Sequence, residues 1–559
     1  MIDGISQRLL DQTRPLRIHL LGVAGSGMSG LAALLLEMGH DVSGSDRVSS
    51  GETERLQGIG LKFSSPHSAD SVSGVEAVVY SSAIKSDNVA LVEAGRSGVP
   101  CLRRAECLAA ILDTRKGVVV AGTHGKTTTS AMCTHILNNG GGKVSHYVGA
   151  EIPVLGANAH WEVDSDYFVA EGDESDGTLG LYQPSHAIVL NIEEEHLDYY
   201  KDLEEIVKVF GKLLERTTER IIYCREDPVA AELCRKYREA ISYGWKESDF
   251  TASNVVEGRG VTSFTVFRRG EEMGRVELGI PGRHNVLNAL AAIALADDLE
   301  VDFNHVTRAL SSFAGAKRRF ESVYLSSRFH VVDDYGHHPT EIAATLQTAR
   351  SLEPGRIVTL FQPHRYSRTE RLAEEFGKAL QGADLVFVTG IYAASESPIK
   401  GISGMTILEA VERQGSTKCV YHEDLETVHH VVGNALRSGD LLLTLRAGNV
   451  HEAGKRISDD LQLIDALESE FAESEMEVRL YESMRRHTTI LVGGPAQFWI
   501  EPRTFSAFSG AGRFCKERGI PVRVVGRGSN LLVRDGGIRG AVIHPSKGEF
   551  GELEVCGDL

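Results

Sequence analysis

The stretch Gly117-Val-Val-Val-Ala-Gly-Thr-His-Gly-Lys-Thr-Thr-Thr129 has the order of strand, glycine-bracketed loop and helix start that is typical of a mononucleotide site. In such a loop the backbone N–H groups and the helix N-terminus face phosphate oxygens, Lys126 neutralises charge, and Thr127 reaches a magnesium ion. The alternative is a plain glycine turn between a strand and a helix. We predict a site for ATP, or for a close analogue, at residues Gly122, Thr123, His124, Gly125, Lys126, Thr127 and Thr128.

Length and composition place the chain among globular enzymes. A length of 559 residues predicts three or four domains, and an apolar content of 42% with 24% charged residues is typical of globular proteins. The net charge of −18 argues against a nucleic-acid partner. No apolar stretch has the length of a membrane span, and the N-terminus lacks the apolar core of a signal peptide. The eight cysteines form no Cys-x-x-Cys pair, which indicates thiols in a reducing compartment. A cytoplasmic enzyme is expected, with its oligomeric state left open.

Four successive stretches each restart a pattern of strands and helices, which predicts a chain of α/β domains. We place these domains at residues 1–104, 105–320, 321–472 and 476–559. The strand candidates of the third stretch are Phe329–Val332, Ile357–Phe361, Leu385–Thr389 and Leu441–Leu445. Helical patterns separate them, so a doubly wound sheet is expected. The acidic helix and tail expected at Leu463–Glu477 indicate a linker.

A second glycine cluster follows the first strand candidate of the chain. Gly25, Gly27 and Gly30 match Gly-x-Gly-x-x-Gly, and Asp46 ends the next strand candidate. This is a dinucleotide fingerprint, but the same geometry serves any pyrophosphate, including that of a UDP-sugar. The identity of the nucleotide stays open on this motif alone.

Two acidic loops follow strand candidates in the second stretch, at Glu171-Gly-Asp-Glu-Ser-Asp176 and Asn191-Ile-Glu-Glu-Glu-His-Leu-Asp198. Parallel sheets bind ligands beyond the carboxyl ends of their strands, which would bring both loops beside the phosphate loop. Carboxylate oxygens suit magnesium, and an imidazole can complete a second metal position. The alternative is that these acids cap the helices that follow.

Further polar clusters open helices in the second and third stretches. In Gly282-Arg-His-Asn-Val-Leu-Asn288, His284 and Asn285 either hydrogen-bond a base or cap a helix. In the third stretch, Asp333-Asp-Tyr-Gly-His-His-Pro-Thr-Glu341 and Gln362-Pro-His-Arg-Tyr-Ser-Arg-Thr369 bring histidines and arginines to adjacent strand ends. Such groups suit a carboxylate and developing phosphoryl charge, and the alternative is solvated loop charge.

Taken together, these motifs resemble those of the Mur ligases of peptidoglycan synthesis. The likeness rests on the phosphate loop, the Glu171 loop and the Gly282 helix start, in this order along about residues 14–470. The Asp334 and Phe361 motifs of the third stretch resemble those of the family member that adds the first amino acid. Two positions depart from the family pattern: Glu194-Glu195 stands where Pro-Asp is usual, and Arg446-Ala-Gly448 stands where Gly-Ala-Gly is usual.

The resemblance implies a fold of three α/β domains: a Rossmann-like UDP-sugar domain, a central P-loop ATPase domain and a C-terminal Rossmann-like domain that closes over the reaction. It implies ATP, Mg²⁺, UDP-N-acetylmuramate and L-alanine, joined through an acyl phosphate. The implied metal ligands are Thr127, Glu171 and His196, and the implied groups near adenine are His284 and Asn285. The implied UDP-sugar residues are Gly22, Gly25, Gly27, Gly30, Asp46 and Ser82. The implied residues around the amino acid and the acyl group are Tyr335, His337, Arg365 and Arg368.

Residues 484–540 resemble a different family. Arg486-His-Thr-Thr489, Gly493-Gly-Pro-Ala496 and Val525-Gly-Arg-Gly-Ser-Asn530 are similar to the FAD-binding front of the UDP-N-acetylenolpyruvoylglucosamine reductases. The substrate domain of that family has no counterpart before Leu559, so we expect an incomplete α+β segment of a longer fusion, without reductase activity. FAD binding is expected only for the complete fusion, and a non-functional tail is the alternative.

Three other functions compete with this interpretation. The first is a related ligase that uses another amino acid, such as glycine or serine. The second is a flavin or nicotinamide oxidoreductase, which the first glycine cluster and the C-terminal segment would suit. The third is a binding module that has lost turnover, against which the complete set of Lys126, Thr127, Glu171 and His196 argues.

Overall fold

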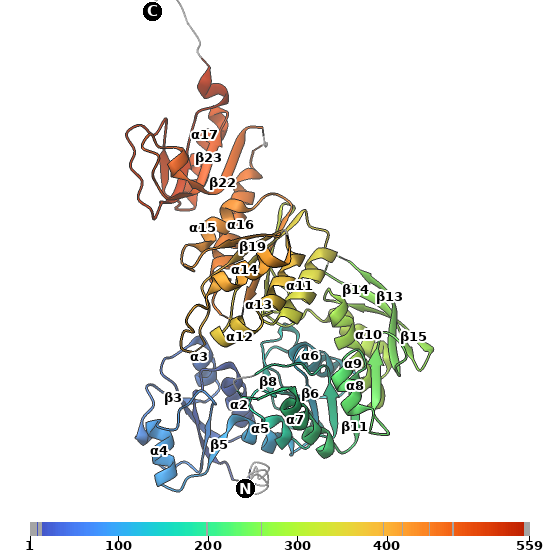
Figure 1. Cartoon of the computed structure of the whole chain (residues 1–559). Coiled ribbons are helices and arrows are strands. Elements are labelled where there is room, and N and C mark those ends of the chain that lie inside the picture. The colour runs from blue at the N-terminus through green and yellow to red at the C-terminus, as the bar shows by residue number, and fades with distance from the viewer. Residues whose placement is uncertain are drawn as a thin grey trace, which may run out of the picture. The chain divides into compact units, whose positions relative to one another are not determined.

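A computed structural model describes Arg8 and residues 14–552, apart from residues 197, 198, 259, 395, 416, 447, 472 and 473. The chain forms two compact units, Met1–Lys317 and Arg318–Leu559 (Figure 1). Each unit contains two of the four sheets. No helix in the described part of the chain is long and apolar enough to cross a membrane.

The first sheet has five parallel strands in the order β3-β2-β1-β4-β5. Its strands are β1 Arg17–Leu21, β2 Asp41–Ser45, β3 Lys62–Ser64, β4 Ala77–Tyr80 and β5 Cys101–Arg103. The helices beside it are α2 Ser26–Glu37, α3 Gly51–Gly58, α4 Val89–Arg96 and α5 Arg104–Leu112. The central strand β1 is buried from Ile18 onward, as expected for a parallel strand covered on both faces. This order places the end of β1 at the middle of the sheet, where the first glycine cluster begins.

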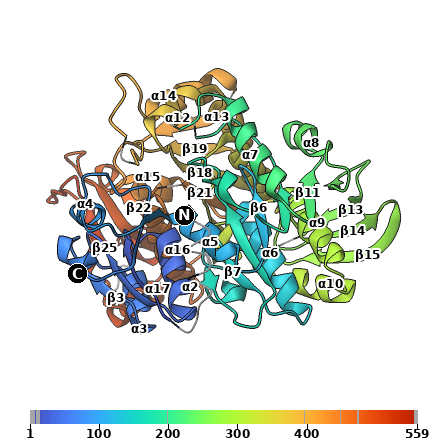
Figure 2. The ribbon, with the colours of Figure 1, turned by 90° about the horizontal axis from the view of Figure 1, so that it is seen from below.

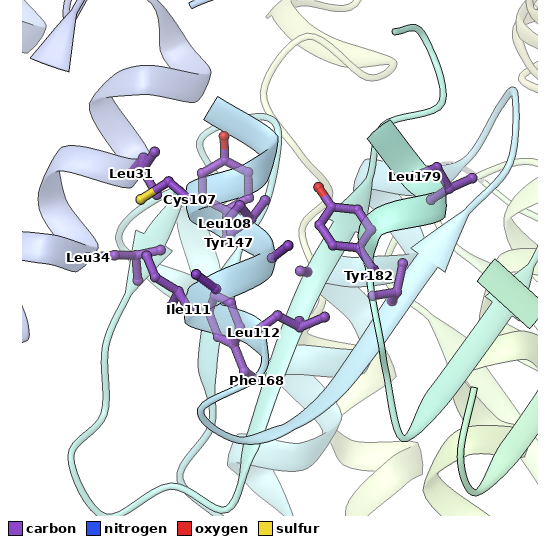
Figure 3. Close-up of a cluster of buried hydrophobic side chains, with 14 of the residues drawn as sticks. Leu31, Leu34, Cys107, Leu108, Ile111, Leu112, Tyr147, Phe168, Leu179 and Tyr182 are labelled. Carbon is purple, nitrogen blue, oxygen red and sulfur yellow. The ribbon is translucent and has the colours of Figure 1, made fainter. Parts of the chain in front are cut away.

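A single hydrophobic core joins the first sheet to the second. Leu31 and Leu34 of α2 lie beside Cys107 and Ile111 of α5, and Phe168 of the second sheet lies in the same cluster (Figure 3). All five side chains are less than 2% exposed. Because α5 is apolar along almost its whole length, it packs between the two sheets and holds them within one unit.

His19 on β1 gives the first sheet a dependence on pH. Its ring nitrogens lie 2.8 Å from Ser43 Oγ and 3.0 Å from Ser45 Oγ, and burial together with nearby His67 lowers its pKa to about 4. The unfolded chain therefore binds a proton at higher pH than the folded chain, so stability falls as pH drops from about 6.5 towards about 4. We expect urea unfolding of a His19→Gln variant to lose about 2 kcal/mol less between pH 7 and pH 4.5 than the wild type loses. Equal losses in the two proteins would contradict this role for His19.

The second sheet has ten strands in the order β15-β14-β13-β12-β11-β10-β6-β9-β7-β8. Its strands are β6 Lys116–Ala121, β7 Ser145–Tyr147, β8 Ala159–His160, β9 Tyr167–Gly172, β10 His186–Val189, β11 Arg220–Cys224, β12 Ile241–Gly244, β13 Phe250–Glu257, β14 Thr262–Arg268 and β15 Glu271–Leu278. Its helices are α6 Lys126–Asn139, α7 Leu203–Arg216, α8 Pro228–Cys234, α9 Arg283–Asp298 and α10 Phe303–Ser312. Helices α6 and α9 pack against each other on one face (Figure 2). Strands β9 and β10 flank β6 in parallel, so three strand ends meet at the phosphate loop.

The third sheet, in the second unit, has the order β16-β17-β21-β18-β19-β20 and is parallel apart from β16. Its strands are β16 Glu321–Leu325, β17 Phe329–Asp334, β18 Arg356–Gln362, β19 Leu385–Val388, β20 Lys418–Tyr421 and β21 Asp440–Arg446. Its helices are α11 Pro339–Ser351, α12 Tyr366–Arg371, α13 Ala373–Ala379, α14 Gly404–Gln414, α15 Val428–Ala435 and α16 His451–Glu468. The four strand candidates of this stretch and the doubly wound sheet are confirmed.

The fourth sheet has the order β22-β23-β25-β24 and forms part of the same unit. It consists of β22 Met476–Ser483, β23 Pro495–Pro502, β24 Val522–Val524 and β25 Ile538–Ile543, with α17 Phe505–Glu517 beside it. The helix expected at the start of Leu463–Glu477 is the end of α16, which continues to Glu468. Its assignment to a linker is wrong, because this end of α16 packs in the core and β22 already begins at Met476. Ile464 and Leu467 are buried in the core, and Asp465 and Glu468 beside them obscure this apolar face in the sequence pattern.

Tyr481 anchors the fourth sheet to α15 and α16. Its hydroxyl donates a hydrogen bond to the buried Asp460 carboxylate, and its ring packs so closely on Gly433 that a Cβ there would lie 2.6 Å from it. We expect Tyr481→Ala to lower the free energy of unfolding by about 3–5 kcal/mol through the cavity it leaves. Tyr481→Phe is the matched control, with an expected loss of about 1–2 kcal/mol, since Gln497 still donates to Asp460. Denaturant unfolding measures both, and an alanine variant as stable as the phenylalanine variant would contradict the anchoring role.

Candidate functional site

The phosphate loop runs from the end of β6 to the start of α6, and its two bracketing glycines have positive φ. Gly122 has φ of +152° and Gly125 has φ of +86°. A Cβ on Gly122 would lie 2.9 Å from Leu190 Cβ, and one on Gly125 would lie 2.7 Å from Asn288 Oδ1. Both conformation and space therefore require glycine, which leaves the backbone of the loop close to any bound group.

The loop is held in shape by Asn191, which follows β10. Asn191 accepts hydrogen bonds from Thr123 N at its backbone oxygen (3.1 Å) and from His124 N at Oδ1 (2.7 Å), and its Nδ2 donates to His124 O (3.0 Å). Thr123 Oγ1 accepts from Glu193 N at 2.9 Å. Asn191 was quoted in the sequence motif but was not among the predicted site residues. Its place directly after a central strand was the signal that could have identified it.

Lys126, the first residue of α6, turns back onto its own loop. Its Nζ donates to Gly122 O (2.6 Å), Thr123 O (3.1 Å) and Glu174 Oε1 (3.0 Å). Burial lowers the pKa of this ammonium, but nearby carboxylates, Glu174 first among them, raise it above its usual value overall. Lys126 is therefore a fully charged cation at the mouth of the phosphate loop.

Thr127 and Glu171 form the adjoining pair. The Thr127 hydroxyl lies 3.0 and 3.2 Å from the two oxygens of the Glu171 carboxylate, which also accepts from Gly149 N at 2.7 Å. A Cβ on Gly149 would lie only 2.6 Å from Glu171 Oε2, so a larger residue there would require this carboxylate to shift. A hydroxyl and a carboxylate together offer the hard oxygen ligands that suit Mg²⁺.

His196 completes the central cluster from the second acidic loop. Its Nε2 lies 3.4 Å from Glu174 Oε1, and its backbone has φ of +55°. The expectation that both acidic loops lie beside the phosphate loop is confirmed by the contacts of Glu171, Glu174 and Asn191. Metal binding by Thr127, Glu171 and His196 stays a prediction, and Asp198 of the same loop lies outside the described residues.

The start of α9 lies against the other side of the phosphate loop. Asn285 is 6% exposed, and its Nδ2 donates to Pro281 O (2.7 Å) while its Oδ1 accepts from Asn288 Nδ2 (3.1 Å). This amide therefore joins the residue before the helix to its next turn, while the N-cap Gly282 receives no side-chain cap bond. His284 is exposed at the same turn. Asn288, which reaches Gly125, was not among the predicted site residues.

The first glycine cluster lies at the N-terminus of α2, where Gly25 is the N-cap residue. Asp46 Oδ2 accepts from Ala24 N at 2.9 Å, so this carboxylate shapes the loop. Ser82 is exposed in the turn after β4. The other glycines of the predicted sugar-nucleotide site are Gly22, with φ of +84°, Gly27 and Gly30.

Arg104 and Tyr147 link this cluster to the acidic loop, and both were missed in the sequence. Arg104 Nη2 donates to Asp173 Oδ2 (2.7 Å) and Nη1 donates to Tyr147 OH (3.2 Å). The Tyr147 hydroxyl in turn donates to Gly27 O at 2.8 Å. Burial alone would raise the pKa of Asp173, but Arg104 and then Lys126 lower it to about 2. A series of interactions thus runs from Gly27 at the start of α2, through Tyr147 and Arg104, to Asp173. The Asp173 carboxylate also interacts with Lys126 of the phosphate loop.

In the second unit, a row of aromatic and basic side chains lies at the ends of β17 and β18, which are not adjacent as predicted but separated in the sheet by β21. The rings of Tyr335 and His337 are 5.2 Å apart, and His337 lies 5.6 Å from His364. Arg368 Nη1 donates to His364 Nδ1 at 2.9 Å. The structure thus brings Tyr335, His337 and Arg368 together through His364, which was quoted in its motif but not predicted as a site residue.

Arg365 is the strained member of this row. It has φ of +68° and ψ of +143°, a conformation that costs a non-glycine residue about 1–3 kcal/mol. Its N–H donates to Tyr392 O (2.8 Å), and its carbonyl accepts from the Thr369 hydroxyl (2.7 Å), which holds the turn. Such strain is common at ligand-binding positions, and the role of Arg365 stays a prediction.

Three family models match consecutive parts of the chain. The model described as Mur ligase family, catalytic domain, matches residues 17–116. The Mur ligase middle domain matches residues 120–296, and the Mur ligase, glutamate ligase domain, matches residues 318–448.

Curated relatives and solved structures agree with these matches. A UDP-N-acetylmuramate–L-alanine ligase from Desulforamulus reducens is 40% identical over 458 residues, which cover 81% of this chain and 99% of that protein. The same enzyme from Pelotomaculum thermopropionicum is 39% identical, with 80% of this chain and 98% of that protein covered. The crystal structure of UDP-N-acetylmuramate-alanine ligase from Thermotoga maritima matches with a TM-score of 0.69 and 30% identity, over 80% of this chain and 99% of that one.

Proposed function

Because this chain belongs to the Mur ligase family and is an ATP-dependent ligase, we propose that it joins L-alanine to the lactyl carboxylate of UDP-N-acetylmuramate. The relatives that carry this activity in their names are matched over nearly their whole length. The observation that carries the proposal furthest is the cluster of Lys126, Thr127, Glu171 and His196 around one glycine-bracketed loop. At one place this cluster offers a cation that can bind phosphates, together with oxygen and nitrogen ligands that can bind a metal ion.

The proposed reaction has two steps. A carboxylate is a poor electrophile, so a lactyl carboxylate oxygen attacks the γ-phosphorus of ATP, which gives an acyl phosphate and ADP. The amine of L-alanine then attacks the acyl carbon, loses a proton, and expels phosphate as the amide bond forms. Phosphoryl transfer of this kind depends on positioning and on neutralised charge, and Mg²⁺ bound to the nucleotide supplies part of that neutralisation.

We assign the chain's residues to these steps by their chemistry. Lys126 and the loop N–H groups would bind the β- and γ-phosphates, with Thr127 and Glu171 on one metal ion and His196 on a second. His284 and Asn285 would lie near adenine, and the glycine cluster with Asp46 and Ser82 would bind the sugar nucleotide. In the second unit, the proposed amino-acid and acyl site consists of Tyr335, His337, Arg365 and Arg368.

We also propose the fourfold division at residues 1–104, 105–320, 321–472 and 476–559. Each of the four sheets falls inside one of these ranges, which supports the division. We propose the last range as the first part of a fused FAD-binding reductase fold, on the likeness of its glycine motifs. Gly493 and Gly528, with φ of +133° and +63°, are positions where glycine is needed. Flavin absorbance of the purified protein is the measurement: we expect none, and bound FAD would overturn the expectation that residues 476–559 by themselves do not hold this cofactor.

We place the enzyme in the cytoplasm, where ATP and a UDP-sugar are available. The cysteines of the described residues are free thiols, as expected in a reducing compartment. Glycine or serine in place of L-alanine is the nearest competing substrate assignment. An oxidoreductase is the competing function of another class.

The test is release of ADP and phosphate with UDP-N-acetylmuramate, Mg-ATP and L-alanine, with each omitted in turn. We expect release only when all three are present, and a slower rate when glycine or serine replaces L-alanine. Release that is indifferent to L-alanine would overturn the substrate assignment. Hydride transfer without ADP release would favour the oxidoreductase.

A further inference from the structure

Glu174 is a buried carboxylate that lies between Lys126, the proposed phosphate-binding cation, and His196, a proposed metal ligand. Its side chain is 2% exposed. Oε1 accepts from Lys126 Nζ at 3.0 Å and lies 3.4 Å from His196 Nε2, whereas Oε2 is buried and has no hydrogen-bond partner among the residues that the structure describes. The backbone oxygen of Glu174 accepts from the Tyr200 hydroxyl, so the residue is anchored from the segment that follows the second acidic loop. An unpaired carboxylate oxygen at this depth is costly unless another partner binds it.

The Lys126 ammonium has three donors, and protein oxygens occupy all three in this structure. Two are carbonyl oxygens of its own loop, and the third is Glu174 Oε1. Binding of phosphates by Lys126 therefore requires that at least one of these bonds opens. Glu174 is the charged partner, so it holds the lysine most strongly and also loses most when the lysine turns away.

We propose that Glu174 is a positioning residue that exchanges partners: it holds Lys126 while the loop is free of nucleotide, and it pairs with the divalent cation at His196 once Lys126 has turned to the phosphates. The free oxygen Oε2 of Glu174 and the adjacent imidazole nitrogen of His196 are the two metal ligands that this second state needs. The exchange keeps a buried negative charge compensated in both states, first by the ammonium and then by the metal ion. The inference rests on the proposed roles of Lys126 and His196.

This exchange predicts opposite effects on two binding reactions. In Glu174→Gln the charged hold on Lys126 is lost, so ADP in the presence of EDTA should bind about 3- to 10-fold more tightly than to wild type. The second manganese ion, counted by electron paramagnetic resonance with a non-hydrolysable ATP analogue, should bind about 10-fold or more weakly. A purely structural role would weaken both reactions together.

Two further variants keep the test decisive. Asp176→Asn removes a charge from the same loop, where Asp176 caps Thr178, and both affinities should stay within about twofold of wild type. Glu174→Asp keeps the charge on a shorter side chain and should shift both affinities in the directions of the glutamine variant by smaller factors. Glu174→Asp replaces Glu174→Gln in the test if the glutamine variant does not fold.

The outcomes separate the inference from the function. Wild type that binds neither the Mg-nucleotide nor two manganese ions would overturn the proposed function and the inference with it. Wild type that binds both, with a Glu174→Gln variant that binds metal-free ADP more weakly or keeps the second manganese ion, would overturn the inference alone.

Discussion

Lys126→Ala is expected to abolish ligation, with a loss of about 10³-fold or more in kcat/KM. The lysine is the cation of the phosphate loop, and no other cation contacts the loop carbonyls in the hydrogen bonds described for this part of the chain. The same change leaves Glu174 buried without its charged partner, which costs about 3–5 kcal/mol in the free energy of unfolding. ADP release and denaturant unfolding measure the two effects separately.

The double variant Lys126→Met with Glu174→Gln distinguishes chemistry from folding. Replacing both partners removes the uncompensated charge, so stability should return to within about 1 kcal/mol of wild type while activity stays absent. A double variant that regains activity would show that Lys126 acts only through stability. A Lys126→Ala variant with more than a tenth of wild-type activity would contradict its assignment to the phosphates.

Glu171→Gln is expected to lower kcat/KM by about 10²–10³-fold and to raise the Mg²⁺ concentration needed for half-maximal rate. The glutamine keeps the shape that accepts from Thr127 and Gly149 but lacks the charge that would bind the metal ion. The Glu171→Gln variant should therefore fold normally but bind the metal ion weakly. Activity measured across a Mg²⁺ titration, beside thermal unfolding, gives both quantities.

Glu219→Gln is the matched control for this prediction. Glu219 is a partly exposed carboxylate of the same unit that pairs only with Lys116 among the ion pairs of the described residues. Its removal should change the rate and the Mg²⁺ dependence by less than about twofold. A Glu171→Gln variant with the Mg²⁺ dependence of wild type would rule out a role for Glu171 in metal binding.

The order of strands and loops along the sequence is enough to predict where the ligand-binding loops lie. The phosphate loop and the two acidic loops each follow a buried strand, and parallel strands end at one edge of a sheet. Strands β9, β6 and β10 are neighbours in that sheet, so the loops that begin at Glu171, Gly122 and Asn191 meet. This physical rule needs no side-chain detail, which is why it can be applied to a sequence.

Local rules leave a residue undecided where two roles share one residue type. The sequence leaves Asn285 open between a base contact and a helix cap. In the structure its amide bonds to Pro281 O and Asn288, and the helix N-cap Gly282 receives no side-chain cap bond. The acidic end of α16 was assigned to a linker, although Ile464 and Leu467 are buried there. Charge on one side of a helix masks an apolar face on the other when the pattern is short.

The sequence by itself therefore determined the elements, their order and the loops that carry the chemistry, because backbone preferences and hydrophobic periodicity act over a few residues. Tertiary structure alone decided which side chains meet across those loops. Glu174 with Lys126, Arg104 with Asp173, and His337 with His364 join positions whose contact depends on how separate segments pack. Such contacts form only once burial has brought the segments together, so no local pattern in the chain encodes them.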